Sequence, residues 1–91
     1  MTTNAMWIQV DSEHTEAFRD EAIARLTRAE DDVVLDFSSV KRLDTKGVRV
    51  LEELAGLAED QSVKLVLRAV NMDVYRVLKL LKLAERFTVL T

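Results

Sequence analysis

The sequence predicts a single α/β domain over residues 1–91, with about four strands in a mixed, mainly parallel sheet and three main helices. Short apolar segments alternate along the chain with longer amphipathic ones, in the order β-α-β-α-β-α-β. The chain has no proline and two glycines, and its predicted elements follow one another through short connections. Alternation of this kind favours parallel strands joined by helices that pack against the sheet.

The first half of the chain predicts two strands with a helix between them. Residues 7–10 form the first predicted strand, in which Trp7 is expected to pack in the core; the alternative is a contact in a dimer. Apolar residues recur at three- and four-residue spacing over residues 13–29, which predicts a helix with one buried face and Ser12 as its cap. The apolar run at residues 33–37 is typical of a buried strand.

The second half continues the alternation. Residues 48–57 predict a second helix, with Val48 on its buried face, and residues 63–69 predict a strand. Asn71 is placed to cap a third helix. Residues 87–90 close the chain as the last predicted strand.

The composition indicates a soluble cytoplasmic protein. Apolar residues make up 48% of the sequence and charged residues 32%, and the longest apolar runs are too short for membrane insertion. We find no secretory signal pattern, and without cysteine there is no disulfide framework or zinc–sulfur site. A net charge of −3, with no aromatic residues among the basic ones, argues against nucleic-acid binding.

The charge is unevenly distributed along the chain. Residues 1–32 contain eight acidic and three basic residues, whereas residues 33–91 contain eight acidic and ten basic ones. Within residues 39–49, Asp44 is the single acid among four bases, which are Lys41, Arg42, Lys46 and Arg49. This basic rim is either a solvated loop and helix face or a surface that steers an acidic partner or a phosphate.

Catalytic and metal-binding arrangements are poorly supported. His14 is the single histidine, it lies among acids, and the chain has no glycine-flanked serine turn. Gly47 and Gly56 are too far apart to cradle a phosphate together. The paired acids are adjacent in sequence, so their side chains point in different directions. We therefore expect no catalytic residue, no metal site, no cofactor and no enzyme activity.

The most informative motif contains Asp44, Thr45 and Gly47. If Asp44 caps the second helix, its carboxylate accepts a hydrogen bond from the N–H of Lys46 or Gly47, and Thr45 becomes the first helical residue with an exposed hydroxyl. Gly47 would leave room for another molecule to approach the backbone. Phosphorylation of Thr45 would add roughly −1.5 to −2 charges at this surface. The alternative is that Thr45 only supports the cap.

The sequence VVLDFSSV at residues 33–40, followed by RLDTKGV at residues 42–48, resembles the STAS domain of bacterial anti-sigma factor antagonists and of sulphate transporter tails. The resemblance covers roughly residues 13–90. In that family the first hydroxyl after the loop aspartate is phosphorylated by an anti-sigma factor that is also a kinase. The resemblance thus implies Thr45 as the phosphoacceptor, because Asp44 matches the loop aspartate and Gly47 the loop glycine.

This resemblance implies a regulatory module that controls transcription by binding a protein partner, the anti-sigma kinase. The residues that it places in the contact are Arg42, Asp44, Thr45, Lys46, Gly47, Val48 and Arg49. The chain departs from the family pattern at Thr45, where serine is usual, and at Lys46, where a small hydroxyl residue is usual. Only about ten residues precede the first helix, so one family strand is expected to be absent or displaced, and the exposed sheet edge favours a homodimer.

The same loop, together with Val70-Asn71, Val74-Tyr75 and Lys79-Leu80, is also similar to the small STAS subunit of Mla-type phospholipid transport complexes. That subunit docks on an ABC ATPase. The second resemblance implies a stable complex with the ATPase, in which the threonine serves contact rather than phosphate turnover. The sequence leaves both functions open.

Overall fold

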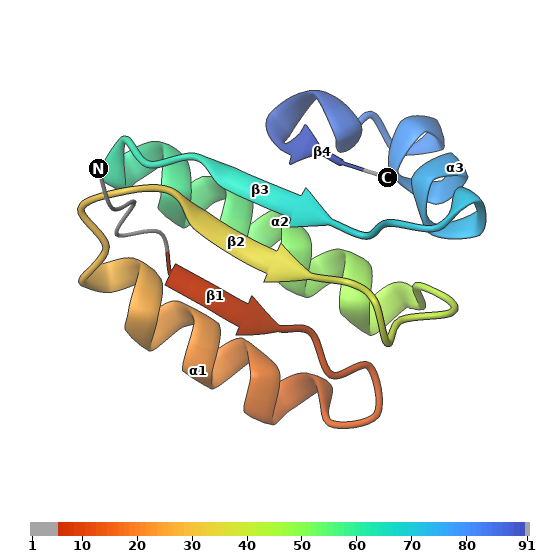
Figure 1. The fold of residues 1–91 in the computed structure, drawn as a ribbon, viewed down its shortest axis with the longest axis horizontal. Helices are drawn as coiled ribbons and strands as arrows, with labels where there is room; N and C mark the ends of the chain where they lie inside the picture. Colours follow the sequence, from red (N-terminus) through yellow and green to blue (C-terminus); the bar gives the residue numbers. More distant parts are fainter. Residues whose placement is uncertain (1–5, 91) are drawn as a thin grey trace.

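Four short strands form the sheet of the computed structural model, which describes residues 6–90 (Figure 1). The strands span Met6–Gln9 (β1), Val33–Asp36 (β2), Leu65–Arg68 (β3) and Thr88–Val89 (β4). They lie side by side in the order β1-β2-β3-β4, and all three neighbouring pairs are parallel. The predicted α/β fold and element order are confirmed, and residues 6–90 contain no antiparallel pair.

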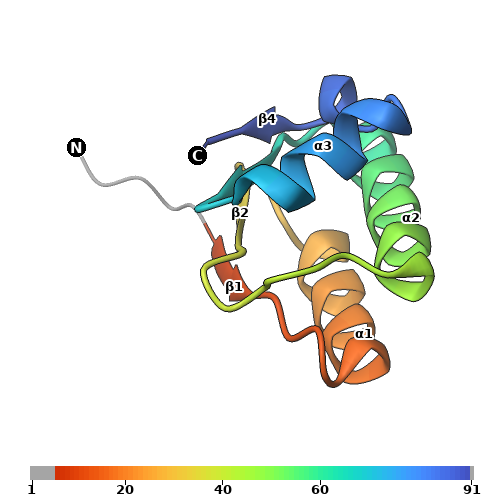
Figure 2. The same ribbon diagram turned by 90° about the vertical axis from the view of Figure 1, so that its right-hand side faces the viewer.

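Each connection between neighbouring strands crosses on the same side of the sheet. The helices α1 (Thr15–Thr27), α2 (Thr45–Gln61) and α3 (Met72–Leu80) follow β1, β2 and β3, and the 3-10 helix η1 (Ala84–Arg86) precedes β4. Because the strand order runs in one direction and such crossovers are right-handed, the helices fall on one face. In Figure 2 the sheet is seen edge-on with the helices beside one face, and no described helix covers the other.

The core fills the space between the helices and the inner face of the sheet. Side chains alternate along a strand, so every second strand residue points into this core. The inward strand residues are Ile8, Val33, Leu35, Leu65 and Leu67, and the buried helix residues include Phe18, Ala22, Leu26, Leu51, Leu54, Ala55, Ala58, Val74 and Leu78. Val48, which was predicted to lie on the buried face of α2, is only half-buried, and Val50 is buried instead.

Trp7 differs from the prediction. Strand alternation turns Ile8 inward, so the neighbouring Trp7 lies on the outer face of β1, with 53% of its surface exposed. Its indole packs against the guanidinium of Arg68, whose carbon lies 5.2 Å from the ring centre. Trp7 is thus a surface residue of the sheet rather than a core residue.

The start of α1 also differs from the prediction. The helix begins at Thr15 after His14, and Ser12 is not its cap. Instead, Oδ1 of Asp11 accepts hydrogen bonds from the backbone N–H groups of Glu13 (3.0 Å) and His14 (3.2 Å). The Asp11 carboxylate satisfies these donors in a turn before the helix, which moves the helix start two residues along the chain.

Two bidentate ion pairs join α2 to its neighbours. Arg19 of α1 donates to both carboxylate oxygens of Glu53 at 2.7 and 2.8 Å, and Arg86 of η1 donates to both oxygens of Glu59 at 3.1 and 3.0 Å. These hydrogen bonds hold the pKa values of the Glu53 and Glu59 carboxyls below the ordinary value of 4.5. Both pairs are exposed to solvent, so each stabilises the fold only modestly.

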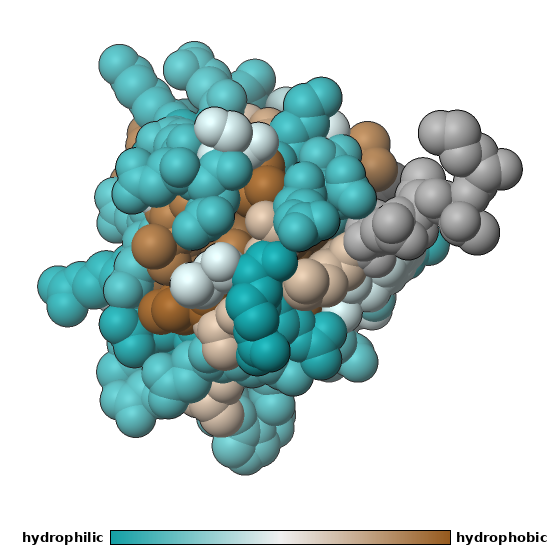
Figure 3. Space-filling model, turned by 90° about the vertical axis from the view of Figure 1, so that its left-hand side faces the viewer, coloured by the Kyte–Doolittle hydropathy of each residue, from teal (hydrophilic) through white to brown (hydrophobic). Residues whose placement is uncertain are grey.

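Figure 3 shows the end of the molecule at which the strands begin. Hydrophilic side chains cover most of this end and surround a hollow in which apolar surface is visible. Within residues 6–90, no helix combines the length and the apolar character that crossing a membrane requires. The predicted site residues lie at the opposite end, where the strands finish (Figure 1).

Candidate functional site

The loops that follow β1, β2 and β3 emerge at the carboxyl edge of the sheet, next to the N-termini of α1, α2 and α3 (Figure 1). In open α/β sheets this edge is the usual place for a binding site. The seven predicted site residues, Arg42 and residues 44–49, occupy the end of the β2–α2 loop and the first turn of α2. We call residues 42–49, which also include Leu43, the α2-start surface.

Asp44 is the N-cap residue of α2. Its backbone is extended (φ −92°, ψ 179°), and its Oδ1 accepts a hydrogen bond from the N–H of Gly47 at 2.8 Å. Its carbonyl accepts a second bond from the N–H of Val48 at 2.9 Å. Thr45 is therefore the first helical residue, and its side chain is exposed. The predicted cap is confirmed, with Gly47 as the donor.

Basic side chains surround Thr45. Arg42 precedes it in the loop, Lys46 follows it, and Arg49 lies one helical turn further on; all three are exposed. None of the three forms an ion pair with a carboxylate of residues 6–90. Because the partial positive charge of a helix N-terminus adds to these cations, the α2-start surface is electropositive.

The space into which a side chain at position 47 would point is already occupied. A Cβ atom built on Gly47 would lie 2.8 Å from Cδ1 of Leu43, closer than van der Waals contact allows. The space beside Gly47 is thus filled by the chain's own Leu43, which is half-buried, and is not open to another molecule. The glycine lets the β2–α2 loop pack tightly on the first turn of α2.

Two polar side chains, one at the end of β1 and one at the start of α3, fasten the β2–α2 loop. The Asn71 amide donates to the carbonyls of Val40 (3.0 Å) and Lys41 (3.2 Å). Gln9 at the end of β1 donates to the Ser39 hydroxyl at 2.8 Å. Sequence analysis identified Asn71 as a helix cap and as part of the second resemblance, but it predicted neither of these hydrogen bonds, because the partners are not close in sequence.

His14 is not connected to a nucleophile. Its Nδ1 lies 2.9 Å from Oδ2 of Asp11, and this hydrogen bond lowers the pKa of the Asp11 carboxyl below its ordinary value of 3.8. No hydrogen bond within residues 6–90 joins His14 to a serine or threonine hydroxyl. The described residues also contain no group of three potential ligands that could hold a metal ion.

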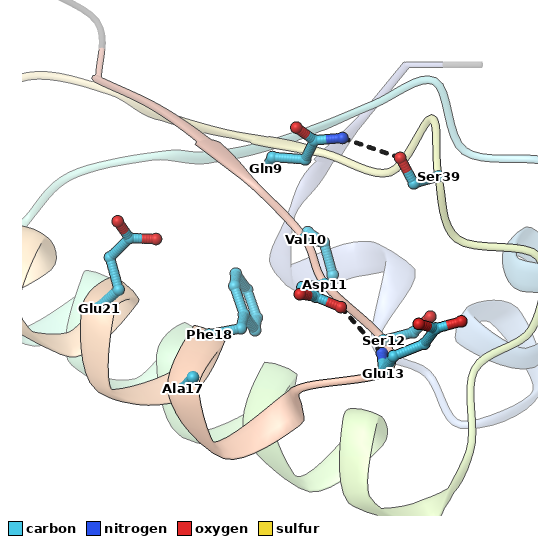
Figure 4. Close-up of a pocket in the computed structure, with 9 residues that line it drawn as sticks. All are labelled: Gln9, Val10, Asp11, Ser12, Glu13, Ala17, Phe18, Glu21 and Ser39. Atoms are coloured by element: carbon cyan, nitrogen blue, oxygen red, sulfur yellow. Dashed lines mark hydrogen bonds between the residues drawn. The ribbon is translucent and has the colours of Figure 1, made fainter.

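A polar groove of about 740 Å³ lies between β1 and α1, and none of residues 42–49 lines it (Figure 4). Its walls carry the carboxylates of Asp11, Glu13 and Glu21, and Phe18 lies at its floor. By contrast, the void beneath the start of α2 measures only about 20 Å³, room for about one water molecule. Asp44 and Lys46 also line a hollow of about 530 Å³ that they share with the start of α1, but it is wide open to solvent. The α2-start surface therefore suits contact with a macromolecule better than enclosure of a small ligand.

Comparison with known proteins places this geometry in a family. A family model described as "Mlab, STAS domain" matches residues 9–91. The crystal structure of TM1081, a candidate anti-sigma factor antagonist from Thermotoga maritima, superposes with a TM-score of 0.78 at 18% identity and covers 100% of this chain and 76% of that one.

The solution structure of TM1081 superposes equally well. Its TM-score is 0.78 at 17% identity, and the match covers 98% of this chain and 75% of that one. No curated protein sequence matched the chain. At these identities the two superpositions establish a common fold.

Proposed function

Because the chain belongs to the STAS domain family, we propose that it is a non-enzymatic regulatory module of the anti-sigma factor antagonist type. It binds an anti-sigma factor kinase through the α2-start surface and is released when Thr45 is phosphorylated. The observation that carries this proposal is the exposed Thr45 at the first position of α2, directly after the Asp44 cap. In this function the protein acts in the bacterial cytoplasm as a regulator of transcription.

The charges around Thr45 support a switch. The partner of an electropositive surface is expected to present acidic residues, which steer association and pair with Arg42, Lys46 and Arg49. A phosphoryl group on Thr45 would add roughly −1.5 to −2 charges at the centre of this surface. It would neutralise the nearby cations and repel both the partner's acids and Asp44. A single modification would then lower affinity without unfolding the domain.

The location of Thr45 also makes it accessible to a kinase. Its side chain is exposed, and no hydrogen bond to it is found within residues 6–90. The loop before Thr45 is fastened by the hydrogen bonds that Asn71 donates to the carbonyls of Val40 and Lys41. The acceptor hydroxyl would therefore be offered from a rigid helix end.

The first experiment identifies the partner and the modification together. The tagged protein is purified from its own cells, and co-purifying chains and the mass of the Thr45 peptide are determined by mass spectrometry. We expect a kinase-like partner and a peptide carrying one phosphoryl group. Thr45→Ala should abolish the modification, whereas Thr15→Ala should leave it, because Thr15 is the first residue of α1 and a matched control.

The second experiment measures the charge effect with the purified partner. Thr45→Glu and Thr45→Asp should weaken binding by at least about tenfold, or ~1.4 kcal/mol. Thr45→Val keeps the shape of the threonine side chain and adds no charge, so this variant should bind nearly as well as the wild type. Equal binding by the wild type and both acidic variants would refute the charge switch.

A second candidate function is the STAS subunit of a phospholipid ABC transport complex, and the name of the matching family model favours it. The same α2-start surface would then dock on the transporter's ATPase. This function predicts co-purification of a membrane-associated ATPase and an unmodified Thr45 peptide. Phosphorylated Thr45 with a soluble kinase partner would exclude it.

A further inference from the structure

The outer face of the sheet carries an ordered mixture of apolar and charged side chains. Strand register aligns Trp7, Val34, Val66 and Thr88 in one row across the four strands. The next outward row consists of Gln9, Asp36 and Arg68, with Leu90 beside Arg68 on the fourth strand. Trp7 is 53% and Leu90 50% exposed, the largest exposed apolar side chains on this face.

A face without a covering layer of helices is unusual for an all-parallel sheet. Parallel sheets occur almost only with both faces covered, because their strands are apolar on both sides. Here Val34 on the outer face is as apolar as its inward neighbours Val33 and Leu35 and is only 9% exposed, although no helix of residues 6–90 lies over the outer face of β2 (Figure 2). The sequence of β2 is therefore that of a strand with a second covering layer.

This face carries one positive and one negative side chain, Arg68 and Asp36, which could pair with the same two residues of a second copy. The Arg68 guanidinium lies over the Trp7 ring and forms no ion pair within residues 6–90. Asp36, its register partner on β2, instead accepts a hydrogen bond from the N–H of Ser38 at 3.0 Å. Arg68 and Asp36 are thus register neighbours in the last outward row of the face, and within residues 6–90 the Arg68 guanidinium has no carboxylate partner.

We propose that a second copy of the chain covers this face, related by a two-fold axis that runs along the strands between β2 and β3. This rotation places β2 of one copy opposite β3 of the other. Val34 then faces Val66 of the second copy, and Asp36 faces its Arg68, so that each charge pair forms twice. A two-fold interface requires such self-complementarity, and two aligned sheets pack about 10 Å apart.

The expected dimer is weak and reversible. The four strands contain two to four residues each, so the face is smaller than the roughly 800 Å² per partner that stable complexes bury. The dimer leaves the α2-start surface free, because that surface lies at the carboxyl edge of the sheet and not on its outer face. This inference is therefore independent of the proposed function.

The first test measures association directly in the full chain. Sedimentation velocity from micromolar to millimolar protein should show a monomer–dimer equilibrium. Trp7 is the single tryptophan, so its fluorescence emission should shift to the blue over the same concentration range. A monomer with constant Trp7 emission up to millimolar concentration would overturn the proposal.

The second test uses the predicted charge pairing. Arg68→Glu alone and Asp36→Lys alone should each abolish the dimer, because each places like charges opposite one another twice. An equimolar mixture of the two variants should restore it as a heterodimer, since both facing pairs are then of opposite charge. Arg76→Glu is the matched control, because Arg76 is an exposed arginine on α3 with the same charge change, and it should dimerise normally.

A third variant tests the same face without touching its charges. Trp7→Thr should abolish dimerisation while leaving the core intact, because the Trp7 side chain lies outside the core. Dimerisation that survives both Trp7→Thr and Arg68→Glu would place the interface elsewhere and overturn the proposal. Partner binding through the α2-start surface should be the same for Arg68→Glu and the wild type, so failure of the dimer is distinguishable from failure of the proposed function.

Discussion

The Asn71 side chain joins the start of α3 to the loop that precedes α2. Its Oδ1 accepts a hydrogen bond from the N–H of Val74 at 2.8 Å, which caps α3, while its Nδ2 donates to the carbonyl of Val40 at 3.0 Å. Both functions use one amide group, so a helix cap and a long-range cross-link depend on the same residue. The cross-link holds the β2–α2 loop and, through it, the α2-start surface.

Replacement of Asn71 by aspartate separates these two functions. Aspartate is a good N-cap residue, so α3 keeps its cap. The donor is lost, however, and a carboxylate then faces the carbonyls of Val40 and Lys41. We expect Asn71→Asp to lower the free energy of unfolding by about 1–3 kcal/mol, measured by urea denaturation.

The matched control is the opposite exchange at the other cap. Asp44 uses only the acceptor Oδ1, towards the N–H of Gly47, so Asp44→Asn keeps the cap and should change stability by less than about 0.5 kcal/mol. Equal losses for both exchanges would show that Asn71 acts only as a cap. Partner affinity should also fall for Asn71→Asp, since the loop before α2 loses its anchor.

The close approach of Leu43 to Gly47 leads to a prediction about coupling between the two residues. In Gly47→Ala the new Cβ displaces the end of the Leu43 side chain, while the helix gains up to about 1 kcal/mol because alanine is the better helix former. We expect these effects to offset each other, so that the single variant differs from the wild type by less than about 1 kcal/mol.

A double-mutant cycle separates the steric conflict with Leu43 from the gain in helix stability. In the Leu43→Ala background the conflict is absent, so Gly47→Ala should there stabilise the protein by about 1 kcal/mol. The measurement is the free energy of unfolding of all four proteins. Identical effects of Gly47→Ala in both backgrounds would mean that Leu43 does not occupy the space beside Gly47.

The features that could be predicted from the sequence depend on residues close together in the chain. The start of α2 was predicted because Asp44, Thr45 and Gly47 form a local cap, and the start of α3 because Asn71 caps residues directly after it. The order of the elements along the chain follows from the alternation of apolar and amphipathic segments with short connections. Each of these inferences needs only local hydrogen bonding and the period of the apolar residues.

The features that could not be predicted depend on competition or on distant contacts. Asp11, not Ser12, accepts the hydrogen bonds from the backbone N–H groups before α1. The sequence alone does not show which of two adjacent side-chain acceptors forms these bonds. Trp7 is apolar enough for the core, yet the strand register turns it outward. The bond from Asn71 to Val40 spans 31 positions, and only the folded chain brings the two residues together.

A negative charge at Thr45 should leave the fold intact. Thr45 is exposed in the first turn of α2, where the helix dipole favours an acidic side chain by roughly 0.3–1 kcal/mol and Asp44 opposes it. We therefore expect the thermal midpoints of Thr45→Glu and the wild type to differ by only a few degrees. A large fall would mean that reduced binding by this variant reports unfolding.

The ion pair between Arg86 and Glu59 makes stability depend on pH in a defined direction. The hydrogen bonds from Arg86 lower the pKa of the Glu59 carboxyl below 4.5, its ordinary value, so the folded protein binds this proton more weakly than the unfolded chain. The contribution of Glu59 is therefore fully present above pH 4.5 and is lost as the pH falls through the lowered pKa. Wild type should be slightly more stable than Glu59→Gln at neutral pH, and the difference should vanish in acid. Glu85→Gln, which removes an exposed carboxylate that forms no ion pair within residues 6–90, should show no such convergence in urea denaturation across the same pH range.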